Sequence, residues 1–156
     1  AVDVCKEALC FGWIDSLPRS LDDRRSMLLV SPRKPRSLWS ALNKTRAERL
    51  TAAGLMSAAG LLRIEAAKAD GSWNALDAVE RLEAPEDLQE ALAARPGAAA
   101  AFAAFPRSAR RGILEWILQA KTAATRARRI AETADKAAAG LRAKQWEQPT
   151  ATNRSI

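Results

Sequence analysis

The residues with the clearest chemistry lie in a basic, proline-containing run at positions 31–40. Its cationic side chains are Arg33, Lys34 and Arg36, and Trp39 closes it. Guanidinium groups donate planar forks of hydrogen bonds to oxyanions, and the prolines in the run limit the entropy lost on binding. A tryptophan beside them can stack on a base or another ring. The run therefore predicts an anion-binding loop.

Asp15 follows an apolar run and is a further candidate ligand-binding residue. Such a carboxylate is either a buried acid with a chemical task or a helix cap or arginine partner, and the partner role is favoured. The basic run has a structural alternative too, in which Trp39 anchors the loop in the core. In that case the arginines pair with Asp15, Asp22 or Asp23. The sequence alone leaves both interpretations open.

A second set of cations lies in the last third of the chain. It comprises Arg110, Arg111, Lys121, Arg126, Arg128 and Arg129. Positions 121, 125, 128 and 129 share one helix face because they are spaced i, i+4, i+7 and i+8. With the arginines that start the preceding helix, they predict a positive surface for an anion or for nucleic-acid phosphates. The alternative is a solvated helix face whose arginines pair with Glu115 and Glu132.

Catalytic and metal-binding chemistry is not indicated. The chain has no histidine, so it lacks the commonest metal ligand and the commonest general acid or base. Cys5 and Cys10 do not form a Cys-x-x-Cys pair, and on a helix they would lie about 140° apart, too far round to bridge. Cys10 has a distinctive context for a nucleophile, yet its apolar neighbours favour burial. We predict no catalytic residue, no metal site and no cofactor, and a binding protein rather than an enzyme.

Composition and charge favour an anionic partner. The 156-residue chain has a net charge of +7 and a pI near 10.1, which suits nucleic acid, a phosphorylated ligand or an anionic surface. The alternative is a small basic protein that is simply soluble. No stretch approaches the roughly 20 apolar residues that span a bilayer, and no signal peptide is visible, so we expect a cytoplasmic protein. The periplasm is the alternative, because the chain starts abruptly inside a predicted helix and looks truncated there.

Helical periodicity and capping residues run through most of the chain. The expected helices cover residues 2–13, 40–54, 55–70, 85–94, 96–104, 108–118 and 125–139. Ser40 and Ser108 are the predicted N-caps, and Gly54 is a predicted helix stop. Residues 15–36 are expected to be irregular, apart from a short strand or core plug at 26–30.

The predicted fold is mainly α: a small multi-helix domain with an irregular Pro/Arg-rich N-terminal loop and little or no sheet. An N-terminal helical part would cover residues 1–82, and a C-terminal helical module residues 83–146. The polar residues 147–156 would form a frayed tail.

Several uncommon strings occur in the order typical of a known family. They are Ala8–Asp15, Ser20–Asp22, Pro32–Asn43, Pro85–Leu88, Ser108–Ile117, Ala120–Lys121 and Thr125–Ile130. Together they resemble the YdeI/OmpD-associated family along nearly the whole chain, to about Trp146. The resemblance implies a bacterial protein linked to bacteriocin protection or stress, with no established reaction or cofactor. Ser26 and Leu29 stand where relatives tend to have an aromatic and a basic residue.

The expected function is therefore that of a non-enzymatic stress or defence protein that binds an anionic ligand or partner through the basic loop. A nucleic-acid-binding protein that uses the combined arginine-rich surface is the alternative. An enzyme that uses Cys10 or Asp15 is a third and weaker hypothesis.

Overall fold

The computed structural model describes residues 2–16 and 18–144 and divides the chain into two compact units, Ala1–Asp77 and Ala78–Ile156. Most of the described residues are helical and the strands are short, which confirms the predicted mainly α class. The tail predicted over 147–156, and the end of the module at 146, lie outside the described residues.

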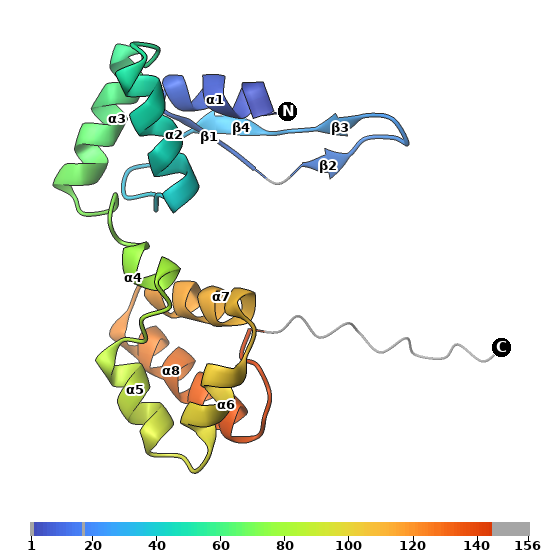
Figure 1. The fold of residues 1–156 in the computed structure, drawn as a ribbon, viewed down its shortest axis with the longest axis vertical. Coiled ribbons are helices and arrows are strands. Elements are labelled where there is room, and N and C mark those ends of the chain that lie inside the picture. The colour runs from blue at the N-terminus through green and yellow to red at the C-terminus, as the bar shows by residue number, and fades with distance from the viewer. Residues whose placement is uncertain (1, 17, 145–156) are drawn as a thin grey trace. The chain divides into compact units, whose positions relative to one another are not determined.

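In the N-terminal unit, a long β-hairpin projects from a group of helices (Figure 1). The helices are α1 (Val2–Cys10), α2 (Ala41–Ala52) and α3 (Ala58–Ala69). Helix α1 contacts both α2 and α3, and it also packs against the first strand of the hairpin.

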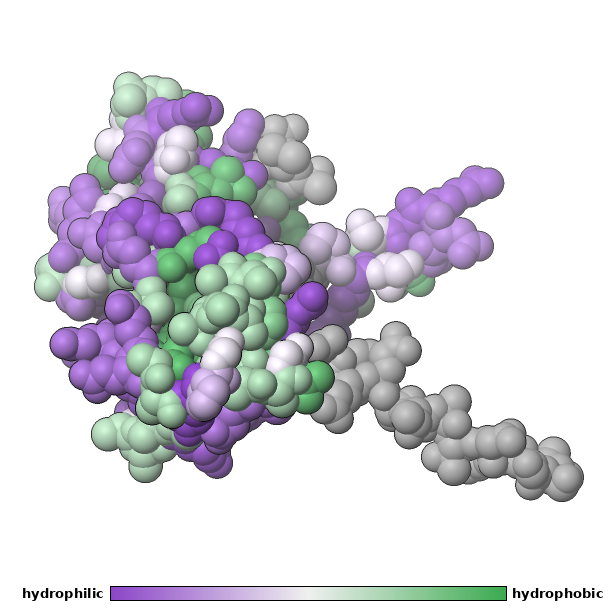
Figure 2. Space-filling model, turned by 60° about the horizontal axis from the view of Figure 1, so that its bottom comes forward, coloured by the Kyte–Doolittle hydropathy of each residue, from purple (hydrophilic) through white to green (hydrophobic). Residues whose placement is uncertain are grey.

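The hairpin occupies most of the segment that was predicted to be irregular. Strand β1 (Trp13–Asp15) pairs antiparallel with β4 (Val30–Pro32), and further out β2 (Arg19–Ser20) pairs with β3 (Ser26–Met27). At the turn, the Asp22 carboxylate accepts hydrogen bonds from the backbone N–H groups of Arg24 and Arg25, at 3.0 and 2.7 Å. This tip is mostly hydrophilic (Figure 2). A carboxylate-capped turn and two short ladders therefore replace the expected loop.

Serine hydroxyls cap two helices of this unit. The Ser40 Oγ accepts the Asn43 N–H, as predicted for the start of α2, and Gly54 follows the end of that helix at φ +69°. The Ser57 Oγ accepts the Gly60 N–H at the start of α3 and donates to the Cys10 carbonyl oxygen at 2.7 Å. The Ser57 hydroxyl thus joins the start of α3 to the end of α1.

The core of the N-terminal unit is small and aromatic. Its buried residues are Leu9, Trp39, Ala47, Ile64, Ala67 and Trp73, with Leu50 and Met56 packed against them. Since alanine contributes little volume, the two tryptophans fill much of the space between the helices.

The C-terminal unit is a bundle of short helices. They are α4 (Asp77–Glu80), which begins at the unit boundary, α5 (Glu86–Ala93), α6 (Ala98–Ala104), α7 (Arg107–Leu118) and α8 (Ala123–Ala138). Helix α8 contacts α5, α6 and α7. Ala98, Ala134 and Ala137 are fully buried, and such small side chains allow close approach of helices.

Three helix starts in this unit differ from the prediction. Helix α8 begins at Ala123, inside the break that was expected at 122–124. Helix α6 begins at Ala98 rather than Pro96, after Gly97 at φ +74°. Helix α7 begins at Arg107 with Pro106 at the N-cap position, so the predicted cap Ser108 lies in the first turn. Proline fits this place because its missing N–H and fixed φ cost nothing before the first helical hydrogen bond.

Among the described residues, none of the helices combines the length and the apolar character that a membrane crossing requires.

Candidate functional site

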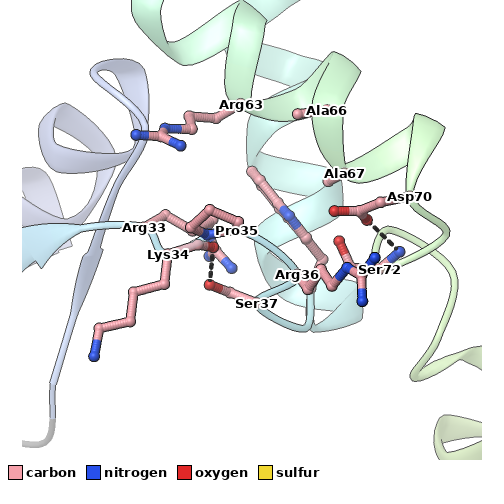
Figure 3. Close-up of a pocket in the computed structure, with 11 residues that line it drawn as sticks. Arg33, Lys34, Pro35, Arg36, Ser37, Arg63, Ala66, Ala67, Asp70 and Ser72 are labelled. Carbon is pink, nitrogen blue, oxygen red and sulfur yellow. Dashed lines mark hydrogen bonds between the residues drawn. The ribbon is translucent and has the colours of Figure 1, made fainter.

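A small cavity of about 90 Å³ lies in the N-terminal unit between the basic loop and α3 (Figure 3). It is lined by Arg33, Lys34, Pro35, Arg36, Ser37, Trp39, Arg63, Ala66, Ala67, Asp70 and Ser72. The cavity therefore brings together the four predicted basic-loop residues and further residues that lie on α3 or just after its end. The sequence did not indicate these further residues.

Arg33 is the central residue of the cavity. It is only 2% exposed, and its Cζ lies 3.9 Å from the centroid of the Trp39 ring. Its Nη1 donates to the Leu38 carbonyl oxygen at 3.0 Å, whereas Nε and Nη2 have no hydrogen-bond partner among the described residues. Burial lowers the pKa of Arg33 to about 10, and the negative charge of Asp15 opposes that fall. The guanidinium is therefore buried, still charged at neutral pH and incompletely hydrogen-bonded.

Trp39 lies beneath this guanidinium in the core. It is 1% exposed, and its ring centroid lies 4.8 Å from that of Trp73 at an interplanar angle of 45°. A ring in this position presents no open face on which a base or sugar could stack. Trp39 instead anchors the loop and supports Arg33, which corresponds to the structural alternative raised for it.

The loop also contains a strained turn that is fastened to the end of α3. Arg36 has φ +58°, a left-handed backbone conformation that residues other than glycine and asparagine seldom adopt. Asp70, the C-cap of α3, accepts the Ser72 N–H at 2.9 Å. Hydrogen bonding from Ser72 lowers the pKa of Asp70, with a further contribution from Arg36. The acidic end of α3 thus helps hold the basic turn in place.

Asp15 does not lie in the cavity wall. It is on β1, where its Oδ2 accepts a hydrogen bond from the Cys5 thiol at 3.2 Å. It acts on Arg33 only through its charge, and the described residues contain no ion pair between the two. Asp22, another proposed partner of the loop arginines, instead pairs with Arg25 at 2.7 Å.

Arg63, Asp70 and Ser72 are the functional candidates that sequence reasoning missed. Arg63, Ala66, Ala67 and Asp70 follow one another at i, i+3, i+4 and i+7, so they share one face of α3. This stripe of two alanines between an arginine and an aspartate was visible in the sequence. Nothing local indicated that the basic loop would lie against it.

Two arginines of the second basic set form ion pairs within the C-terminal unit. Arg111 binds Glu80 and Glu115, both at 2.8 Å, and Arg126 binds Asp87 at 2.7 Å. Hydrogen bonds to these carboxylates raise the pKa of both arginines. These pairs leave less free positive charge on the surface than the sequence suggested.

The other four members of the set differ among themselves. Arg129 donates to the Trp116 carbonyl oxygen and lies 4.9 Å from the centroid of that ring. Arg110, Lys121 and Arg128 form no ion pair within the described part of the chain. Glu115 pairs with an arginine as the alternative proposed, while Glu132 pairs with Lys136.

Both cysteines are free thiols in environments that favour the protonated form. The hydrogen bond to Asp15 raises the pKa of Cys5, with burial adding to it. Burial raises the pKa of Cys10, and the charge of Glu7 adds to it. Since the thiolate is the nucleophile, neither cysteine is activated.

We expect iodoacetamide at pH 7.5 to alkylate both thiols at least about threefold more slowly in the folded protein than in urea, because less thiolate is present. Mass spectrometry of the N-terminal peptide measures both rates. Asp15→Asn should speed the reaction of Cys5 and leave that of Cys10 unchanged. A folded-state rate above the unfolded rate at either thiol would contradict this expectation.

No group of three or more His, Cys, Asp or Glu side chains among the described residues is placed to hold a metal ion.

The protein is therefore a mainly helical, two-unit protein whose N-terminal unit contains a small cationic cavity. Its C-terminal unit carries a domain of the bacteriocin-protection, YdeI or OmpD-associated family, since that family's model matches residues 81–140. This match confirms the predicted family over residues 81–140, and not along the whole chain. Residues 1–63 match the model of a domain of unknown function, DUF8412, so the motifs of the basic loop lie in a separate match. No curated protein and no solved structure matches the chain.

Proposed function

We propose that this is a non-enzymatic stress or bacteriocin-protection protein that binds an anionic ligand in the cavity around Arg33. The observation that carries the proposal is the buried Arg33 guanidinium, whose Nε and Nη2 donors lack partners among the described residues. A buried charge is costly unless it is paired and hydrogen-bonded. An anion in the cavity would supply both the countercharge and the acceptors.

The charges around the cavity support an anionic ligand. Its described lining residues include four cations, Arg33, Lys34, Arg36 and Arg63, and one carboxylate, Asp70. That carboxylate is already engaged by Ser72. The left-handed backbone of Arg36 adds support, because strain of this kind tends to persist where a ligand site requires it.

Binding of nucleic acid through the second basic set is the alternative. Arg110, Lys121 and Arg128 are the members without ion pairs among the described residues, and they would provide it. The engagement of Arg111, Arg126 and Arg129 within the fold favours the cavity instead.

Calorimetric titration of sulfate and inorganic phosphate into wild type and the Arg33→Met variant tests the proposal. We expect Arg33→Met to weaken anion binding at least about tenfold, the equivalent of one lost charged hydrogen bond. Stability should change by less than about 1 kcal/mol, because methionine keeps the contact with Trp39 and removes a buried charge.

Arg19→Met is the matched control, because it removes the same charge from the exposed strand β2. Equal weakening by both variants, or no binding of either anion by wild type at low salt, would contradict the cavity proposal. Steeply salt-dependent binding to duplex DNA that survives Arg33→Met would favour the nucleic-acid alternative.

A further inference from the structure

We infer that the ligand of this cavity is the terminal phosphoryl group of a small molecule, bound as a dianion. The inference rests on the proposed function and adds the chemical class of the ligand. It follows from the size of the cavity, the hydrogen-bonding geometry of Arg33 and the balance of charge in the cavity wall.

The size of the cavity limits the group that enters it. A protein cavity of about 150 Å³ holds a benzene molecule, whereas this one measures about 90 Å³. A phosphoryl group of five heavy atoms is compatible with the smaller volume, and a nucleobase or sugar ring is not. The remainder of the ligand would therefore lie outside, near the exposed side chains of Lys34 and Arg63.

The unpartnered donors of Arg33 form the side of the guanidinium that binds two oxygens at once. In two other arginines of this chain, Nε and Nη2 together bind a carboxylate. Arg126 donates from Nε and Nη2 to the two Asp87 oxygens at 2.7 and 2.9 Å, and Arg111 does so to Glu80 at 3.3 and 2.8 Å. In Arg33 this pair is buried and has no carboxylate partner among the described residues. Because these two atoms have almost no accessible surface, an oxyanion can bind to both of them only when the side chains that cover them move aside.

Charge and direction favour a phosphoryl group over a carboxylate. With four cations and one carboxylate lining the cavity, a dianion balances the wall better than a monoanion does. Arg63 belongs to α3, while Arg33 and Lys34 belong to the loop on the other side of the cavity (Figure 3). Donors on two sides suit a tetrahedral group, which carries oxygens in several directions.

The same features disfavour a phosphodiester. A diester phosphate carries one negative charge and is flanked by substituents on two sides, so it cannot enter a small cavity end-on. The inference therefore separates this site from a nucleic-acid backbone, whose phosphates are all diesters except at chain ends.

The test compares four anions by calorimetry with the 156-residue protein: ethyl phosphate, diethyl phosphate, sulfate and acetate. At pH 7.5 we expect ethyl phosphate and sulfate to bind, and diethyl phosphate and acetate to bind at least about tenfold more weakly, because each is a monoanion. Arg33→Met should abolish the difference, and Arg19→Met should leave it unchanged.

A pH series sharpens the test. A phosphomonoester loses its second charge below a pKa of about 6, so the affinity for ethyl phosphate should fall about tenfold between pH 7.5 and 5. Sulfate stays a dianion, so the affinity of the protein for sulfate should be the same at both pH values. The charged groups of the cavity are Arg33, Lys34, Arg36, Arg63 and Asp70, and Ser72 keeps the pKa of Asp70 low. With no histidine in the chain, the change belongs to the ligand.

The possible outcomes separate the two proposals. If none of the four anions binds, both the proposed function and this inference fail. If acetate or diethyl phosphate binds as tightly as ethyl phosphate, or if ethyl phosphate shows no pH dependence, the phosphoryl inference fails and anion binding stands.

Discussion

Replacing Trp39 with alanine should lower the free energy of unfolding of the N-terminal unit by about 3–5 kcal/mol. The side chain is 1% exposed and contacts both Trp73 and the Arg33 guanidinium. Its buried neighbours include Ala47 and Ala67, which are too small to close the space that it would leave. The variant would therefore contain a large cavity and a buried cation without its aromatic support.

Hydrogen exchange followed by mass spectrometry measures this loss within the N-terminal unit. Trp13→Ala is the matched control, because Trp13 belongs to the same unit and is 40% exposed. We expect the control to cost about 1 kcal/mol or less. Similar losses in the two variants would contradict the anchoring role of Trp39.

Trp39→Phe separates the structural role of this residue from the binding site. Phenylalanine retains an aromatic face for Arg33, so we expect the variant to keep most of its affinity for phosphate while losing part of its stability. Trp39 is thus a positioning residue, which acts on a ligand through the guanidinium above it.

The helices were predictable because their signals are local. Ser40 caps α2 through the N–H three residues on, and Gly54 ends the same helix in a left-handed conformation. Such signals are contained within a few residues of sequence. At the start of α7 the prediction was wrong, because Pro106, two residues before the predicted cap Ser108, occupies the N-cap position.

The hairpin and the cavity depend on contacts between distant residues. Strands of two or three residues are too short to display an alternating pattern, and Trp13 pairs with Pro32 across the whole hairpin. The basic run was visible in the sequence, but its packing on α3 was not. That packing decides that Arg33 is buried while Lys34 is exposed.

Ion pairs between distant residues are the clearest example of contacts that the sequence does not predict. Arg126 binds Asp87 from 39 positions away, and Arg111 binds Glu80 from 31 positions away. Helical spacing predicted one face for positions 121, 125, 128 and 129, but Lys121 lies before α8 begins at Ala123. The spacing also gave no information about the carboxylates that lie opposite Arg111 and Arg126. A continuous positive surface was therefore overestimated from sequence alone.

Replacing Gly60 with alanine should destabilise the N-terminal unit by about 2–3 kcal/mol, although alanine is the better helix former. A Cβ at this position of α3 would lie 2.2 Å from the Cys10 carbonyl oxygen and 2.7 Å from the Met56 methyl group. The methionine can rotate away. The carbonyl cannot, because it accepts both the N–H and the hydroxyl of Ser57, at 3.1 and 2.7 Å.

Gly112→Ala provides the matched control. Gly112 lies inside α7, and a Cβ there would have no described atom within 4 Å apart from its own helix backbone and chain neighbours. Helix propensity then acts alone, so this variant should be more stable by about 0.5–1 kcal/mol. Hydrogen exchange measures the stability of each unit separately. It should therefore show a loss of stability for Gly60→Ala and a gain for Gly112→Ala. A gain in stability for Gly60→Ala would contradict the close approach of α1 and α3.

The Gly60 variant also links this approach to the cavity. Relief of the overlap requires α3 to move away from the end of α1, and α3 carries Arg63 and Asp70, which line the cavity. Phosphate affinity should therefore fall together with stability in Gly60→Ala, whereas it should be unchanged in Gly112→Ala. Calorimetry on both variants measures this. Unchanged phosphate affinity in a destabilised Gly60→Ala protein would mean that the loop holds the anion without help from α3.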